Sequence, residues 1–482
     1  MLNLGRRSER TIILLAIVVH LITAWFSSGY YAADEHYQII AFAQAKLGEL
    51  PYAALPWEYE ERMRTALLPV VAYGVIRTCR SMVSADPFLI AFLLRSLTAV
   101  FALLVVRRIV NVLRPRLSAP MQGPYVALSY LLWFLPYQHV RFSPETWSGL
   151  FLLLGLAGLL SASHRTRTWL VVGLSFGLCV LIKPAMLVAC VGAVTWSLVV
   201  DRQRYTIVPR MLLGGLLALV IGLLADSWFY GEFTPTLWNY LHKNALSITR
   251  IQPLPVAVEP YPWFYYFPWI MKYGIWPIGT VLMGSLFWMT VRKPRSLFIW
   301  CIWPYLAMVS LVPHKELRFL FPLADLAPAV LVLAWEDLRN TTLFSSWSAT
   351  AQRTLVFGAW CLLLTNLIGL LIAGTTAAGS GSTRLAEELG AETGSAHYEA
   401  DNDMVWKIAI PTFYDGPEQP AVTEDACEAR STIVVAQHGE RRSCLNIPIA
   451  TAEPWWATMV LGAYHWRPQD RGWAAYRVKP VK

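Results

Sequence analysis

Two short clusters of ionisable residues stand between long apolar segments and carry the side chains that could do chemistry. Asp34-Glu35-His36 follows the first apolar segment, and His314-Lys315-Glu316-Leu317-Arg318 lies between two segments that are each long enough for a membrane helix. Ionisable groups at a membrane boundary are costly and usually functional. Carboxylates can take a proton from a hydroxyl, and cations can hold a phosphate. Together the clusters suit group transfer from a phosphate to a hydroxyl.

The composition is that of a polytopic helical membrane protein. Of 482 residues, 56% are hydrophobic and only 15% are charged, with a mean hydropathy of +0.44. Soluble proteins average about 25% charged residues. Leu-rich runs recur along most of the chain, which predicts an all-α membrane domain. The first run, 11–28, lacks a small-residue cleavage site after it, so we expect a retained span rather than a signal peptide.

The basic residues gather in short loops between these runs, which is the positive-inside pattern. The net charge of +9 is therefore no indication of nucleic-acid binding. If all the basic loops are cytoplasmic, segment 65–78 cannot span, and we expect it to be an interfacial helix. About eleven transmembrane helices then remain, near residues 11–28, 87–106, 124–140, 146–162, 169–182, 186–200, 208–228, 273–291, 297–312, 319–337 and 354–374.

This topology places every polar constellation on one non-cytoplasmic face. We expect residues 1–374 to form the membrane catalytic domain, with a first outer loop at 29–86 that carries interfacial helices. After a Gly/Ala/Ser/Thr linker, residues 375–482 should form a small extracytoplasmic α/β or β-rich domain, because short strand-like runs occur at 405–410, 432–437 and 458–464.

The seven cysteines fall into two groups. Five lie in or beside apolar runs, where they are expected to be packing residues, and Cys427 and Cys444 lie in the polar tail. The latter two are candidates for a disulfide if the tail faces an oxidising compartment. Free thiols in a cytoplasmic tail are the alternative.

Each chemical cluster also has a plainer interpretation. The acidic pair can cap a helix N-terminus, and the basic run can be an ordinary interfacial loop. The stretch 226–244, rich in aromatic, Asn and His side chains, can bind sugar hydroxyls or anchor the membrane interface. Asp401-Asn402-Asp403 is similar to the acidic metal triplet of soluble nucleotide-sugar transferases, but we expect a solvated loop there. No His or Cys spacing indicates a metal site.

Five stretches together resemble one family, the multi-spanning α-mannosyltransferases of GPI-anchor and N-glycan assembly. The matching stretches are ADEHYQ at 33–38, RFSPETWSG at 141–149, GLSFGLCVLIKP at 173–184, DSWFYGEFTPTLWNYLHKN at 226–244 and HKELRFLFP at 314–322. Their order and spacing fit from residue 1 to about 335, and the last two are specific. The chain departs from the family pattern at Leu317 and at residues 143–145, which read Ser-Pro-Glu.

The resemblance implies a GT-C fold and inverting, metal-independent transfer of mannose from a polyprenyl-phosphate donor to a glycan or glycolipid. No cofactor is implied. By this carry-over Asp34 is the catalytic base and Glu35 assists it, while His314, Lys315 and Arg318 face the donor phosphate. The remaining predicted substrate-binding residues are His36, Gln38, Arg141, Glu145, Asp226, Tyr230, Trp238 and Asn239.

Two other functions would also gather charges in a membrane. A transporter or flippase of lipid-linked sugars should show paired repeats and charges near the middle of its spans. Here the charges lie at span ends on one side, which favours an enzyme. A GT-C transferase of another sugar, such as aminoarabinose, would share the fold and the acidic loop. We expect a site facing the periplasm in a bacterial inner membrane, or the ER lumen if the protein is eukaryotic.

Overall fold

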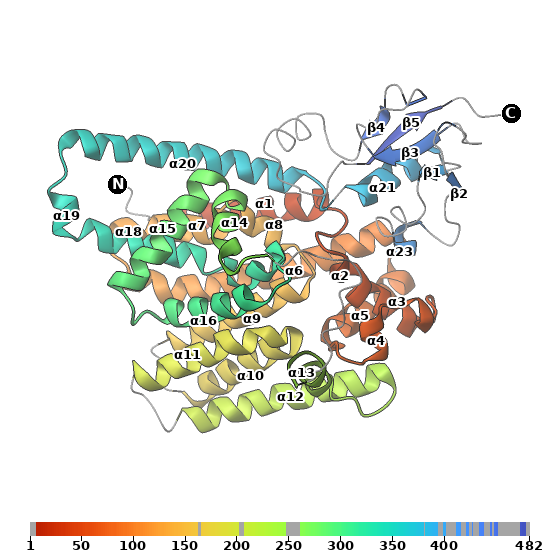
Figure 1. Cartoon of the computed structure of the whole chain (residues 1–482), viewed down its shortest axis with the longest axis horizontal. Coiled ribbons are helices and arrows are strands. Elements are labelled where there is room, and N and C mark those ends of the chain that lie inside the picture. The colour runs from red at the N-terminus through yellow and green to blue at the C-terminus, as the bar shows by residue number, and fades with distance from the viewer. Residues whose placement is uncertain are drawn as a thin grey trace.

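The computed structural model describes a long helical part and fragments of a smaller C-terminal part. The described residues are 6–161, 165–201, 207–246 and 261–379, followed by 381–393, 399–401, 411–415, 421–423, 427, 433–437, 444–445, 448–451 and 473–478. Figure 1 shows most of the long helices lying side by side along the long axis of the molecule, with the strands gathered at one corner. The predicted strand runs at 405–410 and 458–464 lie outside the described residues.

The helical part follows the apolar runs of the sequence. Its longer helices are α1 (Arg6–Phe26), α5 (Leu67–Met82), α6 (Pro87–Leu113), α7 (Ala119–Leu131), α9 (Pro144–Leu159), α10 (Thr166–Ile182), α11 (Leu187–Val199), α12 (Val208–Tyr230), α15 (Trp276–Arg292), α16 (Leu297–Leu311), α18 (Ala327–Arg339) and α20 (Ala349–Thr375). The shorter ones are α2 (Ala33–Glu35), α3 (Ala41–Leu47), α4 (Trp57–Glu60), α8 (Phe134–His139), α13 (Thr236–Leu241), α14 (Tyr266–Tyr273), α17 (Phe321–Ala324), α19 (Thr342–Ser345), α21 (Ser382–Thr393) and α23 (Thr412–Asp415).

Several helix starts are specified locally by capping residues. The carboxylate of Asp86 accepts hydrogen bonds from the backbone N–H groups of Phe88 and Leu89 and so caps α6. The Ser143 hydroxyl accepts from the Thr146 N–H and caps α9. Both helices carry Pro at their first position, where the missing N–H costs no hydrogen bond. This cap fixes where α9 begins, and so it places Glu145 in the helix's first turn.

Four helices among the described residues are long and apolar enough to cross a membrane. They cover Ser8–Phe26, Pro87–Arg116, Val208–Tyr230 and Arg353–Thr375, and a fifth would result if the pair Leu317–Ala324 and Ala327–Arg339 acts as one span. Other predicted spans correspond to helices of 13 to 17 residues, such as α10 and α11. The total of eleven spans therefore stays a prediction.

Two predicted spans are broken rather than continuous. Segment 124–140 divides into α7 and α8, and segment 319–337 divides into a 3-10 turn at Leu317–Leu320, then α17, then α18, with a bend of 65°. Pro322 and Pro328 lie in the first turns of α17 and α18, where proline is tolerated, whereas it would disrupt the interior of one long helix. Hydropathy alone does not reveal such breaks.

Helices α10 and α12 approach each other through small residues. A side chain at Gly173 would collide with the backbone of Met211, and one at Gly214 would collide with the backbone of Leu170. Small residues let membrane helices pack at close range, where dispersion forces are strongest. This packing holds α12 beside α10, and Asp226 lies near the end of α12.

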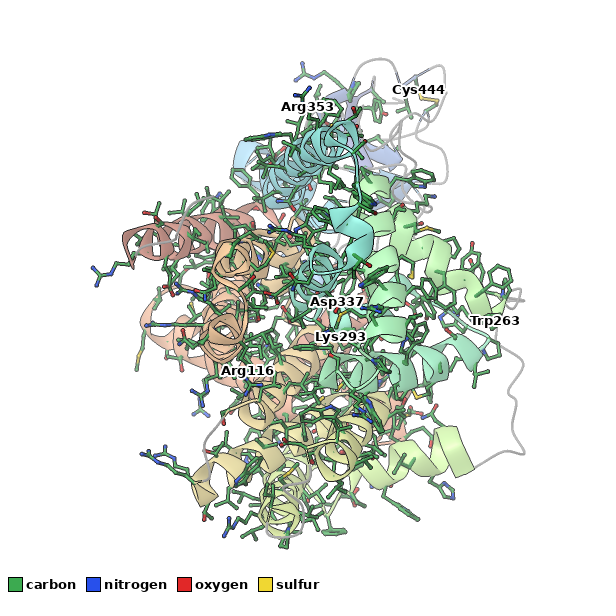
Figure 2. The ribbon with its side chains drawn as sticks, turned by 90° about the vertical axis from the view of Figure 1, so that its left-hand side faces the viewer. Arg116, Trp263, Lys293, Asp337, Arg353 and Cys444 are labelled. Carbon is green, nitrogen blue, oxygen red and sulfur yellow. A yellow bond between two sulfur atoms is a disulfide. The ribbon has the colours of Figure 1, made fainter. Side chains whose placement is uncertain are left out.

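Ion pairs join several basic loops at one end of the helix bundle. Figure 2 is viewed from this end. The Arg114 guanidinium pairs with Glu9 and joins the end of α6 to the start of α1. Lys293 Nζ lies 2.9 Å from Asp337 Oδ1 and joins the ends of α15 and α18. The neighbouring Glu336 accepts a hydrogen bond of 2.6 Å from the Ser118 N–H at the start of α7. These loop ends therefore meet at one end of the bundle.

The described C-terminal part contains a mixed five-stranded sheet of order β2-β1-β3-β5-β4. The strands are β1 (Glu399–Asp401), β2 (Ala421–Thr423), β3 (Ile433–Gln437), β4 (Pro448–Thr451) and β5 (Trp473–Arg477). β1 pairs in parallel with β2 and β3, whereas β5 pairs antiparallel with β3 and β4. A disulfide joins Cys427 and Cys444.

This part is not independent of the membrane part. Leu385 of α21, Phe413 of α23 and Trp473 of β5 share one hydrophobic core with Ile39 and Ile76 of segment 29–86. The backbone N–H of Ala378 also donates to the Ser28 carbonyl at 2.8 Å. The C-terminal elements therefore pack directly on the loop that carries the acidic pair.

Candidate active site

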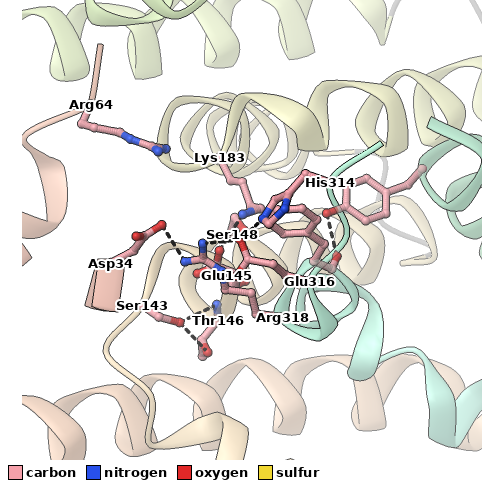
Figure 3. A network of polar contacts seen from close by, with 12 residues as sticks. Asp34, Arg64, Ser143, Glu145, Thr146, Ser148, Lys183, His314, Glu316 and Arg318 are labelled. Carbon is pink, nitrogen blue, oxygen red and sulfur yellow. Dashed lines mark hydrogen bonds and ion pairs between the residues drawn. The ribbon is translucent and has the colours of Figure 1, made fainter. Parts of the chain in front are cut away.

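The centre of the polar site is the guanidinium of Arg318, which lies between two carboxylates (Figure 3). Its Nη1 donates to Asp34 Oδ2 at 2.6 Å, while its Nε and Nη2 donate to the two oxygens of Glu316 at 2.7 and 2.8 Å. The paired bonds to Glu316 fix the plane of the guanidinium. His314 Nε2 lies 2.9 Å from Glu316 Oε1. The acidic and basic clusters predicted from sequence thus meet in one network.

Local backbone geometry turns the two neighbouring acids in different directions. Asp34 and Glu35 form the three-residue helix α2 with Ala33, and a π-helical turn, His36–Ile40, follows directly. Asp34 is half exposed and faces Arg318. Glu35 is buried and lies 3.6 Å from Nη1 of Arg141. Only Asp34 is therefore open to a substrate at Arg318.

A second ion pair adjoins the network. Lys183 follows α10, and its Nζ donates to Oε1 of Glu145 at 2.6 Å. Glu145 is buried in the first turn of α9. The ammonium of Lys183 also lies 5.2 Å from the ring centre of Phe319, one residue beyond Arg318. Figure 3 shows this pair next to Arg318 and His314.

Charge and burial set the ionisation of the site carboxyls. Burial raises the pKa of Glu35 to about 7, and the charge of Glu145 adds to this rise, whereas Arg141 opposes it. Burial would also raise the pKa of Glu316, but the hydrogen bonds and charge of Arg318 and His314 outweigh it and hold the pKa below its ordinary value. Glu316 is thus a fixed anion, while Glu35 can exchange a proton near neutral pH.

The inner side of the acidic pair faces a small cavity beneath the C-terminal part. This cavity has a volume of about 30 Å³ and is lined by Glu35, His36, Arg141 and Tyr414, among others. Its size suits a single water molecule. His36 is buried, and burial lowers the pKa of its imidazole to about 3, so the ring is neutral. His36 packs near the rings of Phe413 and Tyr414.

Arg141, a predicted substrate-binding residue, is almost completely buried in the structure. Its Nη2 donates to the carbonyl and hydroxyl oxygens of Ser27 at 2.5 and 2.9 Å, and its Nη1 donates to the Gly29 carbonyl at 3.2 Å. The guanidinium thus fixes the chain between α1 and α2. Its contact with Glu35 makes it a support for the acidic turn.

The predicted residues of 226–244 form a separate cluster around residues 62–66. Asp226 is buried and accepts hydrogen bonds from the Ala66 N–H at 2.6 Å and from two threonine hydroxyls. Tyr230 donates to the Arg64 carbonyl at 2.8 Å, and Asn239 donates to the Arg62 carbonyl at 3.0 Å. Trp238 is 58% exposed. These residues hold the segment that presents Arg64.

Gln38 belongs to the same region. Its side-chain amide donates to Glu58 Oε1 at 3.0 Å, and Arg64 lies 3.4 Å from the same oxygen. Figure 3 shows Arg64 extending toward the network. Residues of the motif at 226–244 thus contact the backbone of residues 62–66, and Gln38 contacts Glu58 beside them.

The ammonium of Lys315 contacts backbone carbonyls rather than the carboxylates around Arg318. Its side chain is buried, and its Nζ donates to the carbonyls of Val312 and Tyr261 at 2.6 and 3.2 Å. A buried ammonium needs such acceptors, and the carbonyls after the end of α16 supply them. In the described structure the Lys315 ammonium therefore holds the loop in place, and its predicted contact with a donor phosphate stays a prediction.

Sequence reasoning left three charged residues of the site unassigned, namely Glu316, Lys183 and Arg64. Glu316 received no role because only the cations of its run suggested phosphate binding. Its position two residues before Arg318 could have indicated an ion pair with that residue. Lys183 is the last residue but one of the matched motif at 173–184. Arg64 had no motif. Among the described residues, no group of three or more His, Cys, Asp or Glu side chains is arranged to hold a metal ion. Asn402 and Asp403 lie outside the described residues.

A family comparison covers most of the chain. The model of the Alg9-like mannosyltransferase family matches residues 11–407, which include every residue of the network. The chain belongs to the Alg9-like mannosyltransferase family. The resemblance noted from the five sequence motifs is thereby confirmed.

The chain is distantly similar to GPI mannosyltransferases of animals. The GPI alpha-1,2-mannosyltransferase 3 of Danio rerio is 25% identical over 364 residues, which cover 73% of this chain and 63% of the relative. The GPI mannosyltransferase 3 of Drosophila melanogaster is also 25% identical, over 74% of this chain and 60% of the relative. The chain thus spans less than two thirds of the length of these relatives.

Solved structures extend the likeness to the whole fold. ArnT from Cupriavidus metallidurans, in its crystal structure bound to undecaprenyl phosphate, superimposes with a TM-score of 0.55. The match covers 97% of both chains at 12% sequence identity. This Alg9-like chain therefore has the GT-C fold that its motifs imply.

Proposed function

We propose that this protein transfers a mannosyl residue from a polyprenyl-phosphate sugar to a hydroxyl of a glycan or glycolipid acceptor. The observation that carries the proposal is the contact between Asp34 and Arg318, which joins a half-exposed carboxylate to a cation suited to phosphate. Its family membership supports mannose as the sugar. The alpha-1,2-mannosyltransferases among its relatives support an acceptor of the GPI or N-glycan type.

The proposed reaction is a single displacement at the anomeric carbon. The carboxylate of Asp34 takes the proton of the acceptor hydroxyl while the hydroxyl oxygen forms a bond to that carbon. The bond from the carbon to the phosphate oxygen breaks, and the electron pair leaves with the polyprenyl phosphate. One displacement inverts the configuration. No metal is required, because the charge that develops on the phosphate is opposed by fixed cations.

Arg318 retains the donors that this role requires. A guanidinium has five N–H groups, and three of them are used on Asp34 and Glu316. One N–H on each terminal nitrogen remains for a phosphate oxygen. His314 adjoins this group through its contact of 2.9 Å with Glu316. The ammonium of Lys183, which is paired with Glu145, lies beside Phe319, the residue after Arg318.

The proposed orientation puts this site on the non-cytoplasmic face. The ion-paired basic loops lie at the end of the bundle where α1 begins, and the acidic turn follows the other end of α1. Basic loops normally stay in the cytoplasm, so the acidic turn would lie on the opposite side. Residues 375–482 would then form an extracytoplasmic domain that covers the acidic loop. The undecaprenyl phosphate named with ArnT suggests the same class of lipid carrier here, in a bacterial inner membrane or, with dolichol, in the ER.

The test is transfer by the purified protein. Polyprenyl-phosphate mannose, the matching glucose donor and a polyprenyl-phosphate aminoarabinose would each be offered with a panel of glycolipid acceptors, with and without EDTA. We expect mannose to be transferred and EDTA to have no effect. Transfer of aminoarabinose instead would show that the proposed sugar is wrong while the proposed type of reaction is right. Movement of intact lipid-linked sugar across vesicles without transfer would reject the enzyme in favour of a flippase.

A further inference from the structure

Three polar side chains form a buried chain beneath the site, in a region that no motif marks. His20 of α1, His139 at the end of α8 and Asp325 after α17 are all buried. His20 Nε2 lies 3.0 Å from His139 Nδ1, and His139 Nε2 lies 2.7 Å from Asp325 Oδ1. The two imidazole rings are stacked, with centroids 5.2 Å apart. Buried polar groups in a membrane domain are expensive, so this chain calls for an explanation.

The distances fix how many protons the chain holds. His20 Nδ1 lies 2.7 Å from the Ala16 carbonyl, which can only accept, so Nδ1 carries a hydrogen. Two contacts remain, His20 to His139 and His139 to Asp325. If both imidazoles are neutral and Asp325 is ionised, the single hydrogen of His139 can serve only one of them, and the other contact would bring two lone pairs together. One additional proton makes all three contacts hydrogen bonds. The chain as a whole is then neutral, which suits its apolar surroundings.

The chain is coupled to Arg318 through the turn α17. The last turn of α8 holds α17 at two points: His139 contacts Asp325, and the side-chain amide of Gln138 donates to the Phe321 carbonyl. The backbone N–H of Phe321 in turn donates to the carbonyl of Arg318. On the far side, a side chain at Gly149 of α9 would come within 2.8 Å of Pro322, so α17 cannot move toward α9.

The same end of α8 also supports the acidic turn. Arg141 follows His139 by two residues, and its guanidinium contacts Glu35 next to Asp34. The segment 138–141 therefore touches both halves of the network, the turn after Arg318 and the turn that carries Asp34. A shift of this segment would change the separation between the two.

We propose that His20, His139 and Asp325 form a one-proton clamp that positions Arg318 for the lipid phosphate. The three are positioning residues, since none touches the network directly. This inference rests on the proposed function for the identity of the ligand. A purely structural role would stabilise the bundle without changing the affinity for a phosphate.

The test measures binding of undecaprenyl phosphate to the purified full-length protein in detergent, because binding requires no transfer. Asp325→Ala removes the acceptor of His139, and we expect the affinity to fall about 10-fold or more, as small displacements of a positioned group commonly do. Asp325→Asn should retain affinity within about threefold. Its amide can donate to His139 Nε2, so every contact is kept without a net charge.

Two further variants separate positioning from stability. Gln138→Met removes the second hold on α17 without disturbing the proton count, and it should weaken binding even if Asp325→Ala does not fold. Asn366→Ala is the matched control. Asn366 of α20 holds the break between α7 and α8 by two bonds of 2.9 Å, to the Leu131 carbonyl and the Trp133 N–H. It should lower the melting temperature and leave the affinity unchanged.

A double variant tests whether the clamp acts through Arg318. If it does, Asp325→Ala should have little effect on binding once Arg318→Ala is present. Wild-type affinity in Asp325→Ala and Gln138→Met would overturn the clamp and leave the proposed transfer untouched. Equal losses of affinity in Asp325→Ala and Asp325→Asn would show that the hydrogen bond from residue 325 to His139 does not matter, and would overturn the proposed one-proton chain. Binding without any sugar transfer would reject the proposed transfer alone, and a wild-type protein that does not bind the lipid phosphate would reject both.

Discussion

Arg318 donates a hydrogen bond of 2.6 Å to Asp34, although 284 residues separate them in the sequence. The contact joins the turn after α1 to the turn after α16. It brings the proposed base next to the proposed phosphate ligand while both remain partly accessible. In the ligand-free protein each group neutralises the other, and a bound phosphate would compete with Asp34 for Arg318. Donor binding would thereby free the Asp34 carboxylate to accept a proton.

Replacement of Asp34 by Asn should abolish transfer with little effect on donor binding. Loss of a general base typically lowers the rate by about 10²–10⁴-fold. The amide oxygen can still accept the bond from Arg318, so the network should keep its shape. Initial rates and lipid-phosphate binding would be measured side by side. Full activity in Asp34→Asn would exclude Asp34 as the base.

Arg318→Lys should weaken the use of the donor by about tenfold or more. A lysine cannot reproduce the paired bonds to Glu316, so the cation loses its fixed orientation. Lys315→Met is the matched control, because the Lys315 ammonium binds backbone carbonyls instead. This variant should lower the melting temperature and keep the donor KM. The reverse pattern in a donor titration would show that Lys315 is the phosphate ligand.

Glu316→Gln should resemble Arg318→Lys although it removes no cation. The amide provides only one acceptor and no charge, so Arg318 would be free to turn toward Asp34. Hydrogen bonds to charged groups typically contribute about 1.5–3 kcal/mol, so we expect at least a tenfold loss in kcat/KM for the donor. Unchanged kinetics would mean that Glu316 is dispensable for orientation.

Glu35 should make the protein less stable as the pH rises. Its pKa is raised from 4.5 to about 7 on burial, so the folded protein binds this proton more tightly than the unfolded chain. The stabilisation is complete below about pH 4.5 and is lost as the pH rises through 7. Thermal unfolding across this range should show the decline in the wild type and less of it in Glu35→Gln. An equal decline in both proteins would assign it to another group.

The disulfide between Cys427 and Cys444 provides a test of which side the tail occupies. An impermeant thiol reagent on intact cells should label these cysteines only after reduction, in a variant whose exposed Cys361 is replaced by Ser. A loop of 17 residues closed in this way should stabilise the tail by about 3 kcal/mol. Labelling that requires permeabilised membranes would put the tail, and with it the proposed site, on the cytoplasmic side.

The sequence by itself determined the class of the protein and most of its helices. Apolar runs of membrane length specify helices through the cost of unpaired backbone groups in lipid, and that signal is local. The runs at 208–228 and 354–374 each correspond to a single helix for this reason. The five motifs between residues 33 and 322 together also indicated the family, since each is a short contiguous stretch that can be matched without the fold.

Tertiary structure alone decided what each charged side chain contacts. Asp34 and Glu35 are adjacent in sequence, yet one faces Arg318 and the other is buried against Arg141. Lys315 and Arg318 share one run, yet only Arg318 enters the network. The direction of a side chain depends on the backbone turn that carries it and on partners that are remote in sequence. The chain of His20, His139 and Asp325 had no sequence signal at all, because its members come from three separate segments that only packing brings together.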